Sequence, residues 1–159
     1  WSQLTAAPGT DSGPVLVIAQ GLRAYDNIGD ALAAGRKEGK PVFVDISGHG
    51  CVNCREMESR VWSDPRVREI LQNDYVMVTL YTDDKTKLPE SKWMTTDTGK
   101  VLKDVGRVNS YIVRKRFNVN AQPNYALLDS VTGELIVPVR GYDLDVEGYV
   151  AFLKSGLER

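Results

Sequence analysis

The sequence is poor in the residues and runs that several large classes of protein require. Only two of its 159 residues are cysteine and one is histidine, whereas disulfide-held secreted folds carry several cysteine pairs and zinc sites need three or four ligands. No run of about 18 apolar residues occurs, so no segment is predicted to cross a membrane. The formal net charge is -1, which argues against a nucleic-acid partner because such proteins normally present a basic face.

What is present fits one globular domain preceded by a tail. An apolar fraction of 42% and a charged fraction of 26% are ordinary for such a domain. The segment from Ala7 to Pro14 is rich in turn-forming residues, so residues 1–20 are predicted to be a linker or N-terminal tail, with only residues 15–18 able to form a short strand. Residues 21–159 are predicted to form the domain. Because the chain begins at Trp1 rather than Met, we expect it to be a piece of a longer protein.

Apolar periodicity predicts alternating helices and strands in the domain. Helices are expected over residues 26–37, from the cysteines to about 62, from Pro65 through the apolar stripe that ends at Leu71, over 108–117 and over 143–157. Strands are expected over residues 41–46, 75–81, 125–128 and 134–139, the last two as a hairpin. The polar stretch 83–106 is long for a connection and is a candidate specificity feature. This order predicts an α/β fold, with a mixed sheet covered by helices on both faces.

The two cysteines form the motif Cys51-Val52-Asn53-Cys54 at the predicted start of a helix. A bridge that closes so short a loop restrains little of the unfolded chain, so the pair is not expected to serve stability. Free N–H groups and the helix dipole favour a thiolate on Cys51, which lowers a thiol pKa from about 8.5 toward roughly 3.5–7.5. Cys54 lies one turn on and faces the same side. The motif therefore predicts thiol–disulfide exchange, with Cys51 as the nucleophile and Cys54 as the resolving thiol.

Metal binding by the same thiols is the alternative interpretation. His49 is the only histidine, and there is no second Cys-x-x-Cys motif to complete a zinc site. A c-type haem is excluded because its motif needs a histidine where Arg55 stands. We therefore expect no metal and no other cofactor. His49 is interpreted as a loop residue and not as a proton donor, although its charged form would favour a nearby thiolate.

An aspartate interrupts the apolar strand that precedes the cysteines. Asp45 lies six positions before Cys51, and burial there would raise the pKa of its carboxyl group, so it could accept the proton of the resolving thiol through a water. The alternative is an exposed aspartate at the end of the strand. Glu58 lies one turn beyond Cys54 and could assist, while an ordinary solvated helix glutamate is equally compatible with its position.

A proline stands just before the next predicted strand, in Asn120-Ala121-Gln122-Pro123. Proline cannot donate to the ladder of a central strand, so Pro123 is predicted to begin one. Frequencies alone favour a trans peptide bond before it.

Together these residues resemble the thioredoxin family over about residues 25–157. Lys40-Pro41-Val42-Phe43-Val44-Asp45 leads to the cysteine motif, and Phe117-x-Val119-x-Ala121-x-Pro123 matches the segment that carries the family's cis-proline. Gly39-Lys40-Pro41-Val42, Cys51-Val52-x-Cys54-Arg55-Glu56-Met57-Glu58 and Trp62-Ser63-Asp64-Pro65-Arg66-Val67 are similar to the C-terminal periplasmic thioredoxin domain of DsbD-type thiol:disulfide interchange proteins. Two features depart from the pattern: Gly50 replaces the familiar tryptophan, and residues 83–106 exceed a minimal thioredoxin.

The resemblance implies a thioredoxin fold and a periplasmic protein-disulfide reductase. Cys51 would pass electrons from a membrane-embedded domain, upstream of this chain, to the disulfides of periplasmic redox proteins. Asp45 and Glu58 match the two acidic residues that tune the thiols of such domains. The implied substrate contacts are the cis-proline at Pro123, the backbone of Gln122, which would pair with a partner strand, and His49, Val52 and Asn53 around the first cysteine.

Several interpretations stay open at this stage. We expect a monomer tethered to the inner membrane through the upstream domain. The alternatives are a freestanding periplasmic oxidase or isomerase and a thiol-based metal-binding module. About 30 mV corresponds to 1.4 kcal/mol for this couple, so a few hydrogen bonds to the Cys51 thiolate decide the direction of electron flow.

Overall fold

The computed structural model describes residues 13–158, so most of the predicted tail lies outside the described residues. In chain order the elements are β1 (Leu16–Val17), η1 (Ala19–Gly21), β2 (Arg23–Ala24), α1 (Ile28–Glu38), β3 (Val42–Ser47), α2 (Val52–Arg60), α3 (Pro65–Asn73), β4 (Val76–Tyr81), η2 (Glu90–Lys92), β5 (Met94–Thr95), β6 (Val101–Leu102), α4 (Val105–Phe117), β7 (Asn124–Leu128) and α5 (Val146–Ser155). The five predicted helices and the three main strands are present.

The central sheet has three strands in the order β4-β3-β7. β3 is parallel to β4 and antiparallel to β7, so the sheet is mixed as predicted. All six residues of β3 are buried, which explains why this strand has a nearly continuous apolar sequence instead of an alternating one. The outer side of β4 is bridged by Tyr25, which pairs with Val78.

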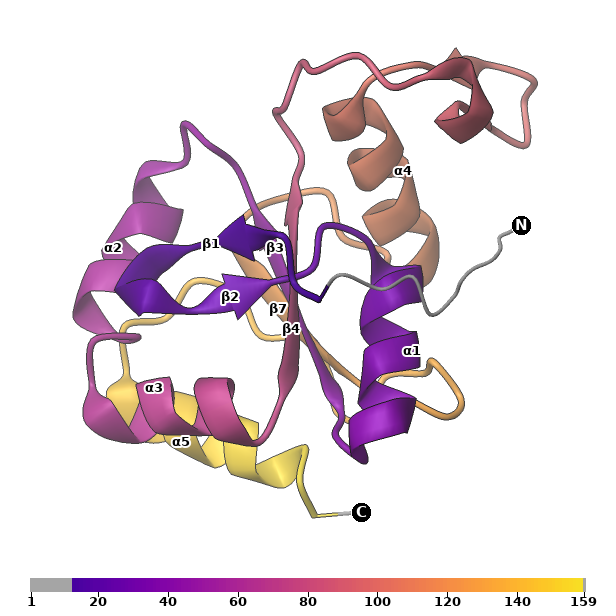
Figure 1. Cartoon of the computed structure of the whole chain (residues 1–159). Helices are drawn as coiled ribbons and strands as arrows, with labels where there is room; N and C mark the ends of the chain where they lie inside the picture. The colour runs from indigo at the N-terminus through magenta and orange to yellow at the C-terminus, as the bar shows by residue number, and fades with distance from the viewer. Residues whose placement is uncertain (1–12, 159) are drawn as a thin grey trace.

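Helices cover both faces of this sheet (Figure 1). On one face, the ring of Phe43 packs against those of Trp62, which precedes α3, and Tyr125 of β7. Tyr125 in turn packs against Tyr149 of α5. On the other face, alternate residues of β3 pack against α1 and α4. Two apolar clusters separated by a buried sheet confirm the predicted α/β architecture. Asp45 shares the face of Phe43 because side chains alternate along a strand.

The predicted hairpin after β7 is only partly correct. The chain does turn at Thr132–Gly133 and return beside β7, but residues 134–139 form no continuous strand. Isolated bridges join Leu128 to Leu135 and Tyr125 to Arg140, and these two bridges are out of register with each other. Pro138 stands between them without an N–H group, so a regular ladder cannot continue through the segment.

The residues just before the domain are also more ordered than a linker. β1 and β2 pair as an antiparallel hairpin, and Leu16 and Ile18 pack against the larger apolar cluster. The domain boundary predicted at residue 20 therefore falls inside a packed hairpin, and the expected short strand over 15–18 appears as β1. The linker assignment for residues 1–12 concerns residues outside those described.

The long polar connection after β4 contains short elements of its own. η2 and the β5–β6 hairpin stand beyond the main sheet and beside α4 (Figure 1). Asp97 in this segment pairs with Lys115 of α4 at 3.0 Å. Gly106, at the start of α4, lies against the backbone of Thr82 and Asp84, where a β-carbon would come within 2.8 Å of both carbonyl oxygens. The insertion is thus anchored at the end of β4.

Candidate active site

The cysteine pair lies where β3 ends and α2 begins. Cys51 and Cys54 are joined by a disulfide, with their Cα atoms 5.2 Å apart. Cys51 is the N-cap residue of α2, and its Sγ accepts the backbone N–H of Cys54 at 3.2 Å. The sulfur of Cys51 therefore has a backbone donor and the positive end of the helix dipole beside it.

Exposure distinguishes the two sulfurs. Cys51 is partly exposed, whereas Cys54 is only 2% exposed. A sulfur that attacks the disulfide of another protein must be reachable from outside, and a resolving sulfur need only reach its neighbour. The geometry therefore suits Cys51 to attack the disulfide of another protein and Cys54 to resolve the mixed disulfide that results.

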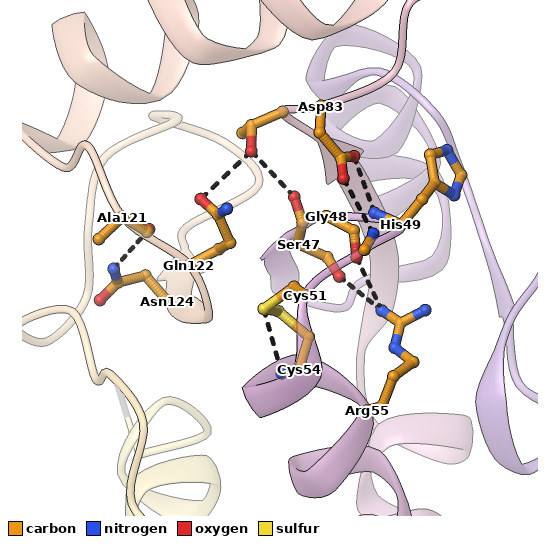
Figure 2. Close-up of a disulfide and its surroundings, with 12 residues drawn as sticks. Ser47, Gly48, His49, Cys51, Cys54, Arg55, Asp83, Ala121, Gln122 and Asn124 are labelled. Carbon is orange, nitrogen blue, oxygen red and sulfur yellow. Dashed lines mark hydrogen bonds between the residues drawn. A yellow bond between two sulfur atoms is a disulfide. The ribbon is translucent and has the colours of Figure 1, made fainter.

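The loop between β3 and Cys51 is held from two sides (Figure 2). On one side, the Asp83 carboxylate accepts the backbone N–H groups of His49 at 2.7 Å and Gly50 at 2.9 Å. On the other side, Arg55 Nη2 donates to Ser47 Oγ at 3.0 Å and to the carbonyl oxygen of Gly48 at 3.2 Å. The approach to the first cysteine is thus fixed by charged side chains from β4's end and from α2.

A second loop meets the site from the start of β7. The peptide bond between Gln122 and Pro123 is cis. The hydroxyl of Thr82 lies 3.2 Å from both the Ser47 carbonyl oxygen and Gln122 Oε1, so it connects the cysteine loop to the proline loop. Pro123 itself is buried, while Gln122 is exposed.

Asp45 of β3 and Glu58 of α2 lie close enough to interact electrostatically. Asp45 is 3% exposed, and its Oδ2 accepts a hydrogen bond from Thr79 Oγ1 at 3.1 Å. Burial, reinforced by the charge of Glu58, raises the pKa of Asp45 to about 7, against the opposing effects of Thr79 and Arg55. Burial also raises the pKa of Glu58, while its ion pair with Arg55 at 3.1 Å opposes the rise. Asp45 is therefore a buried carboxyl, not the exposed one allowed by the alternative interpretation.

The other predicted contact residues surround the first cysteine in different ways. Val52 is 78% exposed, and Asn53 beside it is exposed too. The His49 ring stacks on Tyr81 with centroids 3.8 Å apart, and its Nε2 lies 3.1 Å from Asp84 Oδ2. Figure 2 shows this ring turned away from the disulfide. The structure therefore brings Val52 and Asn53 to the surface beside Cys51 and gives the imidazole of His49 two partners of its own.

Sequence reasoning missed the residues at the end of β4. Thr82 and Asp83 follow β4 directly, and β4 is the parallel neighbour of β3. The carboxyl ends of neighbouring parallel strands meet at one edge of the sheet, so polar residues after β4 were bound to lie near the residues after β3. That signal was available in the strand assignments and points to Asp83.

Within residues 13–158, no three side chains of His, Cys, Asp or Glu are grouped as metal ligands. No helix among these residues is both long enough and apolar enough to span a bilayer.

The sequence model of the thioredoxin-like family matches residues 23–130, which is more than half of the chain. The chain belongs to the thioredoxin-like family. The match begins at β2 and ends just after β7, and it contains both cysteines, Asp45 and Pro123.

Curated relatives of this thioredoxin-like chain include two proteins described as thiol:disulfide interchange protein DsbD. The one from Ralstonia nicotianae is 28% identical over 141 residues, which cover 89% of the chain and 19% of that relative. The one from Salmonella typhi is 44% identical over 50 residues, which cover 31% of the chain and 8% of that relative. The chain thus spans less than a fifth of the length of these relatives.

Solved structures with the same fold agree with the family assignment. An oxidoreductase described as DsbH matches with a TM-score of 0.64 at 18% identity, covering 88% of this chain and 87% of that one. A thioredoxin from Thermus thermophilus matches with a TM-score of 0.58 at 23% identity, covering 84% of this chain and 85% of that one. At these identities the likeness shows the thioredoxin fold, as expected from the sequence.

This thioredoxin-like domain therefore contains a cysteine pair in disulfide contact at the N-terminus of a helix, which is the arrangement that thiol–disulfide chemistry requires. A buried carboxyl lies on the same face of the sheet as α2, and a cis-proline loop lies opposite the cysteine loop.

Proposed function

We propose that this chain is a protein-disulfide reductase of the thiol–disulfide oxidoreductase class. The observation that carries the proposal is the unequal exposure of the two sulfurs: Cys51 caps α2 and can be reached, while Cys54 is buried one turn behind it. A catalyst of exchange needs one thiolate that attacks and a second sulfur close enough to complete the transfer.

The reaction in the reducing direction has two steps. The Cys51 thiolate attacks one sulfur of the partner's disulfide, a mixed disulfide forms, and the first partner sulfur leaves as a thiolate that takes a proton from water. Cys54 then gives its proton to Asp45, directly or through a water, and attacks Cys51. The mixed disulfide breaks, the second partner sulfur leaves, and Cys51 and Cys54 are oxidised by two electrons.

The direction of electron flow depends on the charges that act on the Cys51 thiolate. A strong oxidant of this class owes its potential to a stabilised reduced thiolate. Here two carboxyl groups, Asp45 and Glu58, lie close enough to raise the pKa of Asp45 through their mutual charge. Arg55, the positively charged residue beside them, already forms an ion pair with Glu58 and a hydrogen bond to Ser47. Negative charge near a thiol disfavours its thiolate, which favours the disulfide and hence a reducing couple.

The partners and location follow from the DsbD likeness. We propose that the domain works in the periplasm, receives electrons from a membrane-embedded electron-transfer domain and reduces periplasmic redox proteins. Contact with a partner would occur along the edge formed by Val52, Asn53, Gln122 and Pro123. There the backbone of Gln122 could pair with an extended partner strand.

Equilibration with glutathione tests the direction. The purified domain should equilibrate at a potential near about -270 mV, the value of thioredoxin, and well below the roughly -120 mV of DsbA. The measurement is the reduced fraction by thiol alkylation and mass across a series of glutathione redox buffers. A potential near that of DsbA would show an oxidase and would overturn the reductase assignment.

A further inference from the structure

Asp83 binds the loop that leads into Cys51, and it takes no part in the two exchange steps or in the proton transfer to Asp45. Its two carboxylate oxygens accept the only two backbone N–H groups between Gly48 and Cys51, at 2.7 Å from His49 and 2.9 Å from Gly50. The Cys51 N–H itself donates to the Gly48 carbonyl oxygen at 3.3 Å. Every amide that leads into the first cysteine is therefore committed to an acceptor other than sulfur.

The carboxylate is also a close neighbour of the cysteine. A β-carbon placed on Gly48 would lie 3.2 Å from Asp83 Oδ2 and 3.4 Å from Cys51 Cβ. The Asp83 carboxylate and the Cys51 β-carbon therefore both lie beside Gly48. Partial desolvation opposes ionisation, but the hydrogen bonds from Gly50 and His49 prevail and hold the pKa of Asp83 below its ordinary value. A negative charge consequently stands beside the loop at neutral pH.

Building on the reductase function proposed above, we propose that Asp83 is a positioning residue for exchange: it holds the amides of His49 and Gly50 away from the Cys51 sulfur and so keeps Cys51 a reducing thiol. Backbone N–H groups stabilise a nearby thiolate when they point at it. In this site the Cys51 sulfur accepts the Cys54 N–H, while the two amides before it are withheld by a carboxylate. Asp83 acts through the loop and does not touch the partner's disulfide.

Other charged groups around the loop differ from Asp83 in what they contact. Asp84 reaches the ring of His49 and the backbone of Thr86 instead of the loop amides. Arg55 binds the loop through oxygen atoms and pairs with Glu58. The charges of Glu58 and Arg55 act on Asp45, and those of Asp45, Arg55, Glu58 and Asp83 act on Tyr81. Only Asp83, among the described residues, binds the amides that precede the cysteine.

The test compares Asp83→Asn and Asp83→Ala with a matched control, Asp84→Asn. Asparagine keeps one acceptor oxygen and removes the charge, whereas alanine releases both amides. The measurement is the pH at which alkylation of reduced Cys51 by iodoacetamide reaches half its maximal rate. Compared with the unaltered protein, this pH should be lower by about 0.5 unit in Asp83→Asn and by about one unit in Asp83→Ala, because solvent screens charges near the protein surface. Asp84→Asn removes a negative charge from the next residue and should shift the pH of half-maximal alkylation by less than about 0.2 unit.

The glutathione equilibrium gives a second readout that a purely structural role would not move in this direction. At pH 7 the reduced form should gain about twofold in Asp83→Asn and about fivefold in Asp83→Ala, because only the ionised share of the Cys51 thiol is stabilised. An unchanged or raised half-point in both Asp83 variants would overturn the proposal, as would an equal shift in Asp84→Asn. If the unaltered protein shows no unusually reactive Cys51, the reductase function fails; if it does and the variants do not shift, only the role of Asp83 fails.

Discussion

Replacing Cys54 with alanine is expected to stop exchange at a covalent intermediate. The reduced variant still has the exposed, helix-capping Cys51, so it should attack the aromatic disulfide DTNB and release one equivalent of thionitrobenzoate. Without Cys54, the mixed disulfide on Cys51 has no internal sulfur to resolve it. The unaltered protein should release two equivalents and end as the Cys51–Cys54 disulfide. The measurement is thionitrobenzoate absorbance together with the mass of the protein.

The matched variant is Cys51→Ala, which leaves the buried sulfur alone. Cys54 is 2% exposed, so it can react only through local opening of the structure, and its reaction with DTNB should be slower by about a hundredfold. A fast adduct in Cys51→Ala together with a slow one in Cys54→Ala would reverse the assignment of the nucleophile.

Replacing Asp45 with asparagine is expected to stabilise the oxidised protein against unfolding at pH 8 and to lower the rate of thiol–disulfide exchange by the reduced protein. The pKa of Asp45 is raised from 3.8 to about 7 in the folded state, so the folded protein binds a proton between these values that the unfolded chain releases. Stability due to the neutral carboxyl is therefore complete below about pH 4 and is lost as pH rises toward 7 and beyond. A shift of about three pKa units corresponds to roughly 4 kcal/mol.

Asparagine mimics the neutral carboxyl and can still accept the hydrogen bond from Thr79. The free energy of unfolding in urea should thus favour Asp45→Asn by several kcal/mol at pH 8 and by little at pH 4. Exchange should slow by about tenfold to a hundredfold, because the resolving thiol loses its proton acceptor. The control is Asp74→Asn at the exposed end of α3, which should change stability by less than about 0.5 kcal/mol. Equal stability of Asp45→Asn and the unaltered protein at both pH values would contradict the raised pKa of the buried Asp45 carboxyl group.

Much of this fold is predictable from local signals that agree with the final packing. Pro65 at the first turn of α3, with Asp64 accepting the N–H of Arg66, behaves as the sequence indicates. The buried run of β3 and the glycine at the end of α1, Gly39 with a φ of 70°, are equally local features. The position of Cys51 as N-cap follows from the same kind of evidence, since a strand ends just before it.

The features that sequence reasoning missed depend on contacts between distant segments. Asp83 binds the cysteine loop only because β3 and β4 are parallel neighbours. The hairpin of β1 and β2 is fixed by the apolar cluster on which Leu16 and Ile18 rest, and its own sequence is too short to indicate pairing. The return strand beside β7 is an exception, because the residue that interrupts it, Pro138, is a local signal in the sequence. The cis bond before Pro123 runs against simple frequency and was expected from the family resemblance alone.

The proposed exchange chemistry requires the Cys51 sulfur to be ionised at the N-terminus of α2 near neutral pH. It is tested most directly by the rate of iodoacetamide alkylation of Cys51 in the reduced protein as a function of pH, with each cysteine identified by peptide mass. We expect half-maximal reactivity near pH 7 and, at pH 6, a rate about five to ten times that of free cysteine, after allowing for the lower nucleophilicity of a more acidic thiol. A half-point near 8.5, the value of an ordinary cysteine, would contradict the account.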